Sequence, residues 1–165
     1  MRHDPKVVEH LNIQLVNELT AINQYFLNAR LLRHWGVTKL GAHEYKESIE
    51  EMHHADWLIE RILLLDGLPR VHQLDKVVIG KTVEEILRAD LALEEKACGD
   101  LRPGIADCEK AQDYVSRDLL ARILASEEEH IDFLEAQIDL LGLIGAERYI
   151  ALNSAPATEA GNSDS

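Results

Sequence analysis

Two short segments, EMHH at residues 51–54 and EEEH at residues 127–130, decide the fold of this 165-residue chain. Each is a Glu-x-x-His motif, whose i, i+3 spacing places the carboxylate and the imidazole on the same face of an α-helix. A lone glutamate precedes each motif by 33 residues. Four carboxylates and two imidazoles in this repeated arrangement suit a two-metal site inside a four-helix bundle. The predicted metal ligands are Glu18, Glu51, His54, Glu94, Glu127 and His130.

The composition favours a single helical domain. Apolar residues make up 46% of the chain and aromatic residues only 5%, which argues against a many-stranded sheet. No stretch approaches the roughly 18 consecutive apolar residues of a membrane span, and the first residues lack the apolar run of a secretory signal. We therefore expect a cytoplasmic protein, with one domain over residues 1–152 and a flexible tail over residues 153–165.

Charge and cysteine content exclude several classes of partner and scaffold. The formal net charge is −13, so nucleic acids and anionic membranes would be repelled. Cys98 and Cys108 are too few for a disulfide framework or a zinc ribbon. We expect both cysteines to be reduced and to pack as small apolar side chains.

Apolar periodicity predicts four long helices and one short one. In the first helix Glu18 lies in the middle of an apolar stripe, where a buried carboxylate needs a compensating cation. Residues 67–81 have no helical stripe and are long enough to cross the whole bundle. Thr82 and Glu85 form a predicted capping box at the start of the third helix. The expected helices cover residues 5–34, 39–66, 82–110, 113–141 and 146–152.

The predicted turns between helices place the ligands within each hairpin at one level. A turn near residue 36 leaves Glu18 and His54 equidistant from it, and a turn near residue 112 does the same for Glu94 and His130. Pro103 predicts a kink or break over residues 99–104, because proline lacks the amide hydrogen of a helix interior. Gly142 is expected to end the fourth helix.

Carboxylate and imidazole ligands without thiolate favour iron, manganese or zinc. We assign Glu18 and Glu94 as terminal ligands, Glu51 and Glu127 as bridges, and one histidine to each ion. Tyr25 is placed to hydrogen-bond a ligating carboxylate and Asp90 to orient a ligand imidazole, although ordinary core or surface roles suit both residues equally well.

Two alternatives compete with this assignment. Glu50 and His53 also form a Glu-x-x-His motif, but only residues 51 and 54 repeat 76 positions later. A set of surface acids that form salt bridges on long helices is the other alternative, and the matched upstream glutamates on apolar stripes argue against it.

The chain resembles the bacterioferritins, members of the ferritin-like di-iron carboxylate proteins, over residues 1 to about 152. Besides the six predicted ligands, seven segments match that family: residues 17–19, 21–26, 51–52, 54–56, 90–94, 113–118 and 130–132.

The resemblance implies a ferritin-like bundle and a cage of 24 subunits, built from dimers, that stores a ferric mineral. It implies ferroxidase activity, the oxidation of iron(II) by dioxygen or peroxide, at a di-iron centre in each subunit. It also implies haem b shared between two subunits, with Met52 as an axial ligand, and a bacterioferritin-associated ferredoxin as a reductant. A di-iron peroxide reductase, or a haem-binding structural subunit of a mixed cage, is the alternative function.

The chain departs from the family at the inner surface. Some members carry histidine at the position of Lys46 and aspartate at the position of Glu50, where they bind an additional iron ion. A protonated Lys46 cannot be a ligand, which argues against such a site here. Five other histidines lack a partner at ligand spacing and are expected to face solvent: His3, His34, His43, His53 and His72.

Overall fold

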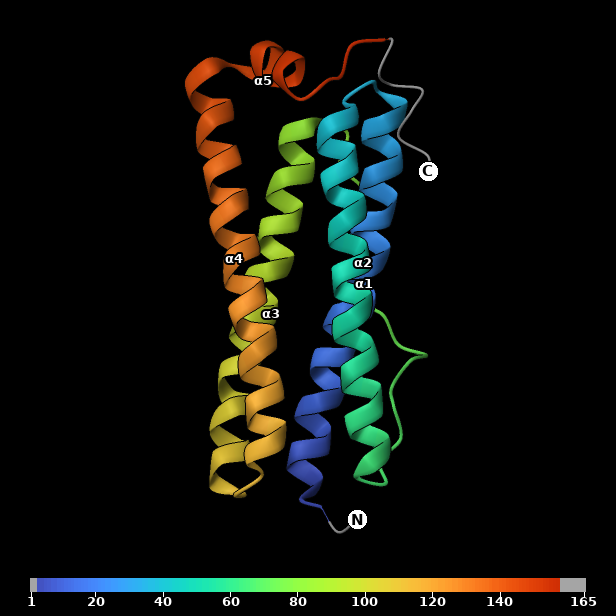
Figure 1. The fold of residues 1–165 in the computed structure, drawn as a ribbon, viewed down its shortest axis with the longest axis vertical. Helices are drawn as coiled ribbons and strands as arrows, with labels where there is room; N and C mark the ends of the chain where they lie inside the picture. The colour runs from blue at the N-terminus through green and yellow to red at the C-terminus, as the bar shows by residue number, and fades with distance from the viewer. Residues whose placement is uncertain (1–2, 158–165) are drawn as a thin grey trace.

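A computed structural model describes residues 3–157 of the chain. This part consists of five helices: α1 (Pro5–His34), α2 (Thr38–Leu64), α3 (Val83–Lys110), α4 (Tyr114–Ile144) and α5 (Ala146–Leu152). The α1–α2 and α3–α4 hairpins lie side by side along the bundle (Figure 1). The predicted all-α four-helix bundle with a long crossover and a short fifth helix is confirmed.

Residues 65–82 form the crossover between the end of α2 and the start of α3 at the opposite end of the bundle (Figure 1). Polar side chains of α1 hold this segment by its backbone. Asn12 Oδ1 accepts from Arg70 N at 2.7 Å, Thr20 Oγ1 from Asp75 N at 3.0 Å, and Gln24 Oε1 from Val78 N at 3.2 Å. Because the crossover spans the bundle from one end to the other, α2 and α3 run in the same direction.

Helix ends follow local backbone chemistry. Gly36, with φ of 85°, lies in the turn between α1 and α2, and Gln112, with φ of 58°, lies in the turn between α3 and α4. Thr82 caps α3 by accepting from Glu85 N at 3.1 Å, as predicted. The Glu85 carboxylate accepts from Lys81 N at 2.6 Å, one residue before the reciprocal bond of a capping box.

Two apolar clusters fill the bundle on either side of a polar layer. All four long helices contribute buried side chains to each cluster, and most of the buried side chains between the clusters are polar. The first cluster contains Val7, Leu11, Leu15, Ala55, Leu58, Ile62, Leu65, Leu101, Cys108, Leu120 and Ile123. The second contains Leu32, Val37, Leu40, Val83, Ile86, Leu87, Leu134, Leu141 and Tyr149.

A kink or a break was predicted at residues 99–104, and the break is wrong, because α3 continues through Pro103 to Lys110. Proline in a helix interior costs about 3 kcal/mol or more. The buried face of α3 continues beyond it with Gly104 and Cys108, so ending the helix would expose that face. A side chain at Gly104 would lie 3.2 Å from Leu120, which shows how closely α3 and α4 approach here.

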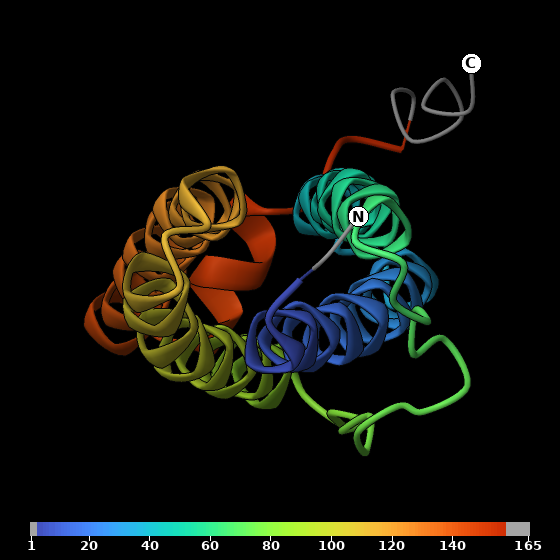
Figure 2. The same ribbon diagram turned by 90° about the horizontal axis from the view of Figure 1, so that it is seen from below.

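Gly142 does not end α4, contrary to the prediction. The helix continues to Ile144 and stops at Gly145, whose φ of 84° and ψ of 156° suit glycine. This turn directs α5 across the end of the bundle, as seen along the bundle axis in Figure 2. Tyr149 of α5 is thereby fully buried, and its hydroxyl donates to Gln137 Oε1 at 2.7 Å.

The segment after α5 begins against the bundle. Lys39 N donates to Asn153 O at 2.9 Å, and Ala155 N donates to Thr38 Oγ1 at 2.9 Å. Residues 153–155 are thus tied to the start of α2 and are not part of a flexible tail. Residues 158–165 of the predicted tail lie outside the described residues. Among residues 3–157, no helix combines the length and the apolar content that crossing a membrane requires.

We predict that Gly145→Ala destabilises the protein by roughly 1–3 kcal/mol, because alanine is strained at this positive φ. The free energy of unfolding in guanidinium, compared at one protein concentration, measures the effect. Gly142→Ala is the matched control: no heavy atom lies within 4 Å of an added Cβ, so it gains roughly 0.5–1 kcal/mol of helix stability. Equal effects of the two substitutions would contradict the assignment of Gly145 as the residue at which α4 stops.

Candidate metal centre

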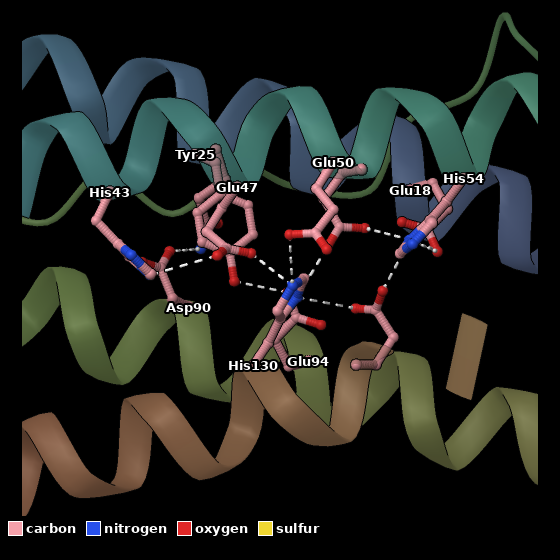
Figure 3. A network of polar contacts seen from close by, with 12 residues as sticks. Glu18, Tyr25, His43, Glu47, Glu50, His54, Asp90, Glu94 and His130 are labelled. Atoms are coloured by element: carbon pink, nitrogen blue, oxygen red, sulfur yellow. Dashed lines mark hydrogen bonds and ion pairs between the residues drawn. The ribbon is translucent and has the colours of Figure 1, made fainter. Parts of the chain in front are cut away.

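The structure brings the six predicted ligands together at the level of the polar layer (Figure 3). One ligand comes from α1, two from α2, one from α3 and two from α4. None is more than 7% exposed. Matched hairpin turns produce this convergence, because they bring residues equidistant from a turn to the same height.

The six side chains form two adjacent groups that share two carboxylates. Glu18, Glu51, His54 and Glu127 form the first group, and Glu51, Glu94, Glu127 and His130 form the second. Within each group one ligand atom per residue lies within 4.8 Å of the others. The arrangement can hold two cations side by side.

Each shared carboxylate offers one oxygen to each group. Glu51 Oε2 lies 3.3 Å from His54 Nδ1, and Glu51 Oε1 lies 3.0 Å from His130 Nδ1. Glu127 Oε1 lies 3.0 Å from His54 Nδ1, and Glu127 Oε2 lies 3.8 Å from His130 Nδ1. The two oxygens of a carboxylate are therefore oriented to bridge two ions, while Glu18 and Glu94 each face one position.

Unsatisfied atoms at the centre indicate that the protein alone does not complete it. Glu51 Oε1, Glu94 Oε2, Glu127 Oε1 and His130 Nδ1 are buried and form no hydrogen bond of acceptable geometry. Buried polar atoms normally have partners, so several unsatisfied atoms that point at one another require an explanation. A pair of cations among them would satisfy all four atoms, and the donor set suits iron, manganese or zinc.

The two imidazoles act as counter-charges in the metal-free centre. Burial alone would lower the pKa of His54, but close contacts with the carboxylates of Glu127, Glu18 and Glu51 raise it to about 12. The pKa of His130 is also raised, because its contacts with surrounding carboxylates, Glu127 foremost, outweigh its burial. Both rings are therefore imidazolium cations in the metal-free protein at neutral pH. Each must lose one proton to bind a metal ion.

Carboxylates of the centre titrate differently from one another. Burial, together with repulsion from neighbouring carboxylates, raises the pKa of Glu51 and of Glu94 well above the ordinary value. Burial also acts against ionisation of Glu127, but its contacts with Glu94 and with both histidines lower its pKa. The bridging position of Glu127 is thus negatively charged before any metal arrives.

Tyr25 lies beside the second group. Its hydroxyl donates to Glu94 Oε1 at 2.6 Å. Burial and the negative charge of Glu94 raise the pKa of the phenol well above 10, so it remains protonated and remains a donor. This contact is the kind that the sequence analysis predicted for Tyr25.

Asp90 does not orient an imidazole. Its Oδ1 accepts hydrogen bonds from Gln24 Nε2 at 3.0 Å and from Asn28 Nδ2 at 2.8 Å. Burial raises the pKa of Asp90 to about 6, although hydrogen bonds, first that with Glu44, act against the rise. The prediction failed because Asp90 faces α1 and α2, where two amides and a carboxyl meet it first.

The sequence analysis missed Glu47 and misplaced His43. His130 Nε2 lies 2.5 Å from Glu47 Oε2, and His43 Nε2 lies 3.4 Å from Glu47 Oε1. His43 is half-buried and stacks on the Phe133 ring, with centroids 3.9 Å apart, so it does not simply face solvent. The spacing of residues 44, 47, 51 and 54, three acids and a histidine at three- and four-residue steps on one helix face, is the signal that could have identified Glu47.

Residues outside the centre lie as follows. His34, His53 and His72 are exposed, as expected. Lys46 is exposed, whereas Glu50 Oε2 lies 3.4 Å from His130 Nε2. Met52 is 50% exposed on the outer side of α2, although Glu51 beside it is fully buried.

Comparison with known proteins agrees with this geometry. A model of the ferritin-like domain matches residues 8–144. The bacterioferritin of Brucella melitensis is 51% identical over 160 residues, which cover 97% of this chain and 99% of the relative. The bacterioferritin of Mycobacterium tuberculosis is 49% identical over 92% of this chain and 95% of the relative. That of Streptomyces coelicolor is 48% identical over 92% and 90%, respectively.

We predict that the affinity for Co(II) rises with pH, because a metal ion must displace the protons held by His54 and His130 at raised pKa. Each proton displaced makes the apparent affinity change about tenfold per pH unit. Titrations at pH 6, 7 and 8, with proton release followed in weak buffer, measure the effect. An affinity independent of pH, with no protons released, would contradict the assignment of these imidazoles as ligands.

Proposed function

Because the chain belongs to the bacterioferritin family, we propose that it stores and detoxifies iron by oxidising iron(II) at this centre. The oxidant is dioxygen or peroxide, and the oxidised iron is kept as a ferric mineral. The observation that carries the proposal is the pair of shared carboxylates, Glu51 and Glu127, each with one oxygen toward either half of the centre. This geometry suits two ions that act on one small oxidant.

Charge balance supports two divalent ions as the occupants. Four carboxylates bring four negative charges into a layer that water barely reaches. Two divalent cations with two neutral imidazoles cancel that charge, whereas one cation leaves the buried layer negative. With a single ion, protons on a carboxylate or on the second imidazole would have to balance the remaining charge of about two units.

The side chains of the centre then have distinct roles. Two bound iron(II) ions would together supply the two electrons that reduce dioxygen to peroxide or peroxide to water. Glu18 with His54, and Glu94 with His130, bind one ion each, and the shared carboxylates fix the distance between the ions. Tyr25 holds Glu94 in place by its short hydrogen bond, and the two apolar clusters restrict water at both ends.

Storage requires an assembly, and we propose a homo-oligomeric cage of 24 subunits built from dimers, as the family resemblance implies. The cage would be cytoplasmic, and a bacterioferritin-associated ferredoxin would supply electrons for iron release. The strong negative charge suits a container for cations and argues against nucleic acid as a partner.

The outer face of α2 suits the proposal that haem b binds between two subunits. Met52 presents a half-exposed thioether, and Tyr45 and Ile49 on the same face of α2 are also exposed. Phe26 of α1 lies beside Tyr45, with ring centroids 6.4 Å apart. An apolar surface with a thioether suits a haem whose iron takes one methionine from each of two subunits.

We predict that the wild-type protein binds two iron(II) ions per chain without oxygen and oxidises them in a fast phase when oxygen is admitted. In Glu127→Ala the oxidation rate in the fast phase should fall at least tenfold, because the substitution removes one of the two proposed bridging carboxylates. Stopped-flow absorption of the ferric product in the near ultraviolet measures the rate.

Glu128→Ala is the matched control, because Glu128 is the next residue along α4 and its side chain is more than half exposed. Its fast phase should equal that of the wild type. A fast phase that survives in Glu127→Ala would remove the bridging role and, with it, the proposed oxidation at this centre.

For the haem, Met52→Leu should abolish incorporation and leave assembly intact, because leucine keeps the apolar contact and lacks the sulfur ligand. The Soret absorption per chain measures haem, and light scattering measures the mass of the assembly. Haem retained at the wild-type level in Met52→Leu would reject Met52 as the axial ligand.

A further inference from the structure

A chain of buried amides connects the outer surface to one metal-ligating carboxylate. Gln14 Nε2 donates to Glu18 Oε1 at 2.8 Å, and Gln14 Oε1 accepts from Asn17 Nδ2 at 3.3 Å. Asn17 Oδ1 accepts from Lys96 Nζ at 2.8 Å, and Asn17 Nδ2 also donates to Asp100 Oδ2 at 2.9 Å. The chain thus links the surface of α3 to the centre through α1.

The ion pair at its outer end fixes the direction of every amide. An ammonium group has only donors, so Lys96 requires the oxygen of Asn17, while the Asp100 carboxylate requires its nitrogen. The same nitrogen then faces Gln14, which must present its oxygen to Asn17 and its NH₂ group to Glu18. Glu18 therefore receives a donor. A flipped Gln14 would place its oxygen against the Glu18 oxygen and its NH₂ group against the NH₂ group of Asn17.

Gln14 occupies a position that an apolar residue would fill at lower cost. Its side chain is 1% exposed, and its neighbours at one-turn spacing include Leu11 of the first apolar cluster. A buried amide contributes little net stability over a well-packed apolar side chain, even when both its atoms are bonded. The contact that distinguishes glutamine from leucine here is the donated bond to Glu18.

We propose that Gln14 is a positioning residue that holds Glu18 in the orientation in which it binds the metal ion beside His54. Asn17, fixed by Lys96 and Asp100, keeps Gln14 in place. The inference rests on the proposed function, since it takes Glu18 as a ligand of the centre. Glu94 in the other half is held by the Tyr25 phenol, so the two equivalent ligands have different supports.

The proposal predicts a loss of metal affinity confined to one half of the centre. Partners that orient a metal ligand typically contribute a factor of 10–100 to affinity. Gln14→Leu, which keeps the size of the side chain and removes the donor, should therefore weaken binding beside Glu18 about tenfold. It should leave binding beside Glu94 unchanged.

Co(II) titration without oxygen, followed by the visible d–d absorption, tests this in two backgrounds. His130→Ala retains only the Glu18 half, and His54→Ala retains only the Glu94 half. Gln14→Leu should weaken Co(II) binding about tenfold in His130→Ala and not in His54→Ala. Tyr25→Phe should give the reverse pattern, and Asn23→Leu, which loses only an exposed bond to Leu19 O, should change neither.

Thermal unfolding of the metal-free variants separates positioning from general support. Gln14→Leu should unfold within a few degrees of the wild type, because leucine suits the buried site. Asn17→Ala is a second variant, which keeps Gln14 but removes the hydrogen bond from Asn17 that fixes it. It should give a smaller loss of Co(II) affinity, and only in the His130→Ala background.

Equal losses in both backgrounds, or no loss in either, would overturn the positioning role while leaving two Co(II) ions bound by the wild type. A wild-type protein that binds no Co(II) at the centre would overturn the proposed function, and the role of Gln14 would fall with it. The wild-type titration therefore distinguishes the two failures.

Discussion

A layer of buried carboxylates is the constraint on which the rest of the structure depends. Four glutamates lie within a few ångströms of one another between two apolar clusters, and none is more than 1% exposed. Removing ions from water costs several kcal/mol each, so apolar packing cannot stabilise such a layer by itself. In the metal-free protein the raised pKa values of Glu51 and Glu94 and the two imidazolium groups limit the net charge, and two divalent cations would balance all four ionised carboxylates. The apolar clusters stabilise the bundle, and the buried carboxylates favour the binding of cations between them.

The two halves of the centre have the same ligands but different surroundings. Tyr25 donates to Glu94 and Glu47 meets His130, whereas the amide of Gln14 donates to Glu18. Hydrogen bonds of this kind fix the orientation of a ligand and affect how strongly it binds. The internal repeat of the ligands is therefore not a repeat of their environments, and the two ions need not be held equally.

Helix α2 serves two sites at once because successive residues of an α-helix point about 100° apart. Glu51 points into the centre and is fully buried, while Met52 beside it is half-exposed on the outer face. One turn of one helix thus supplies a shared carboxylate to the proposed metal centre and a thioether to a surface where haem and a second subunit are proposed. Few substitutions in this turn would leave both sites unaffected.

The sequence by itself determined the five helices, the crossover and the convergence of six proposed ligands, because apolar periodicity, turn residues and equal distances from a turn are local properties. Tertiary structure alone decided which oxygen of Glu51 and Glu127 faces which imidazole, and it revealed the contacts of Gln14 and Glu47. It also decided that Asp90 meets amides instead of an imidazole. Those outcomes depend on side chains that arrive from different helices. Spacing along one helix gives the face of a residue but not the partner that packing brings to it.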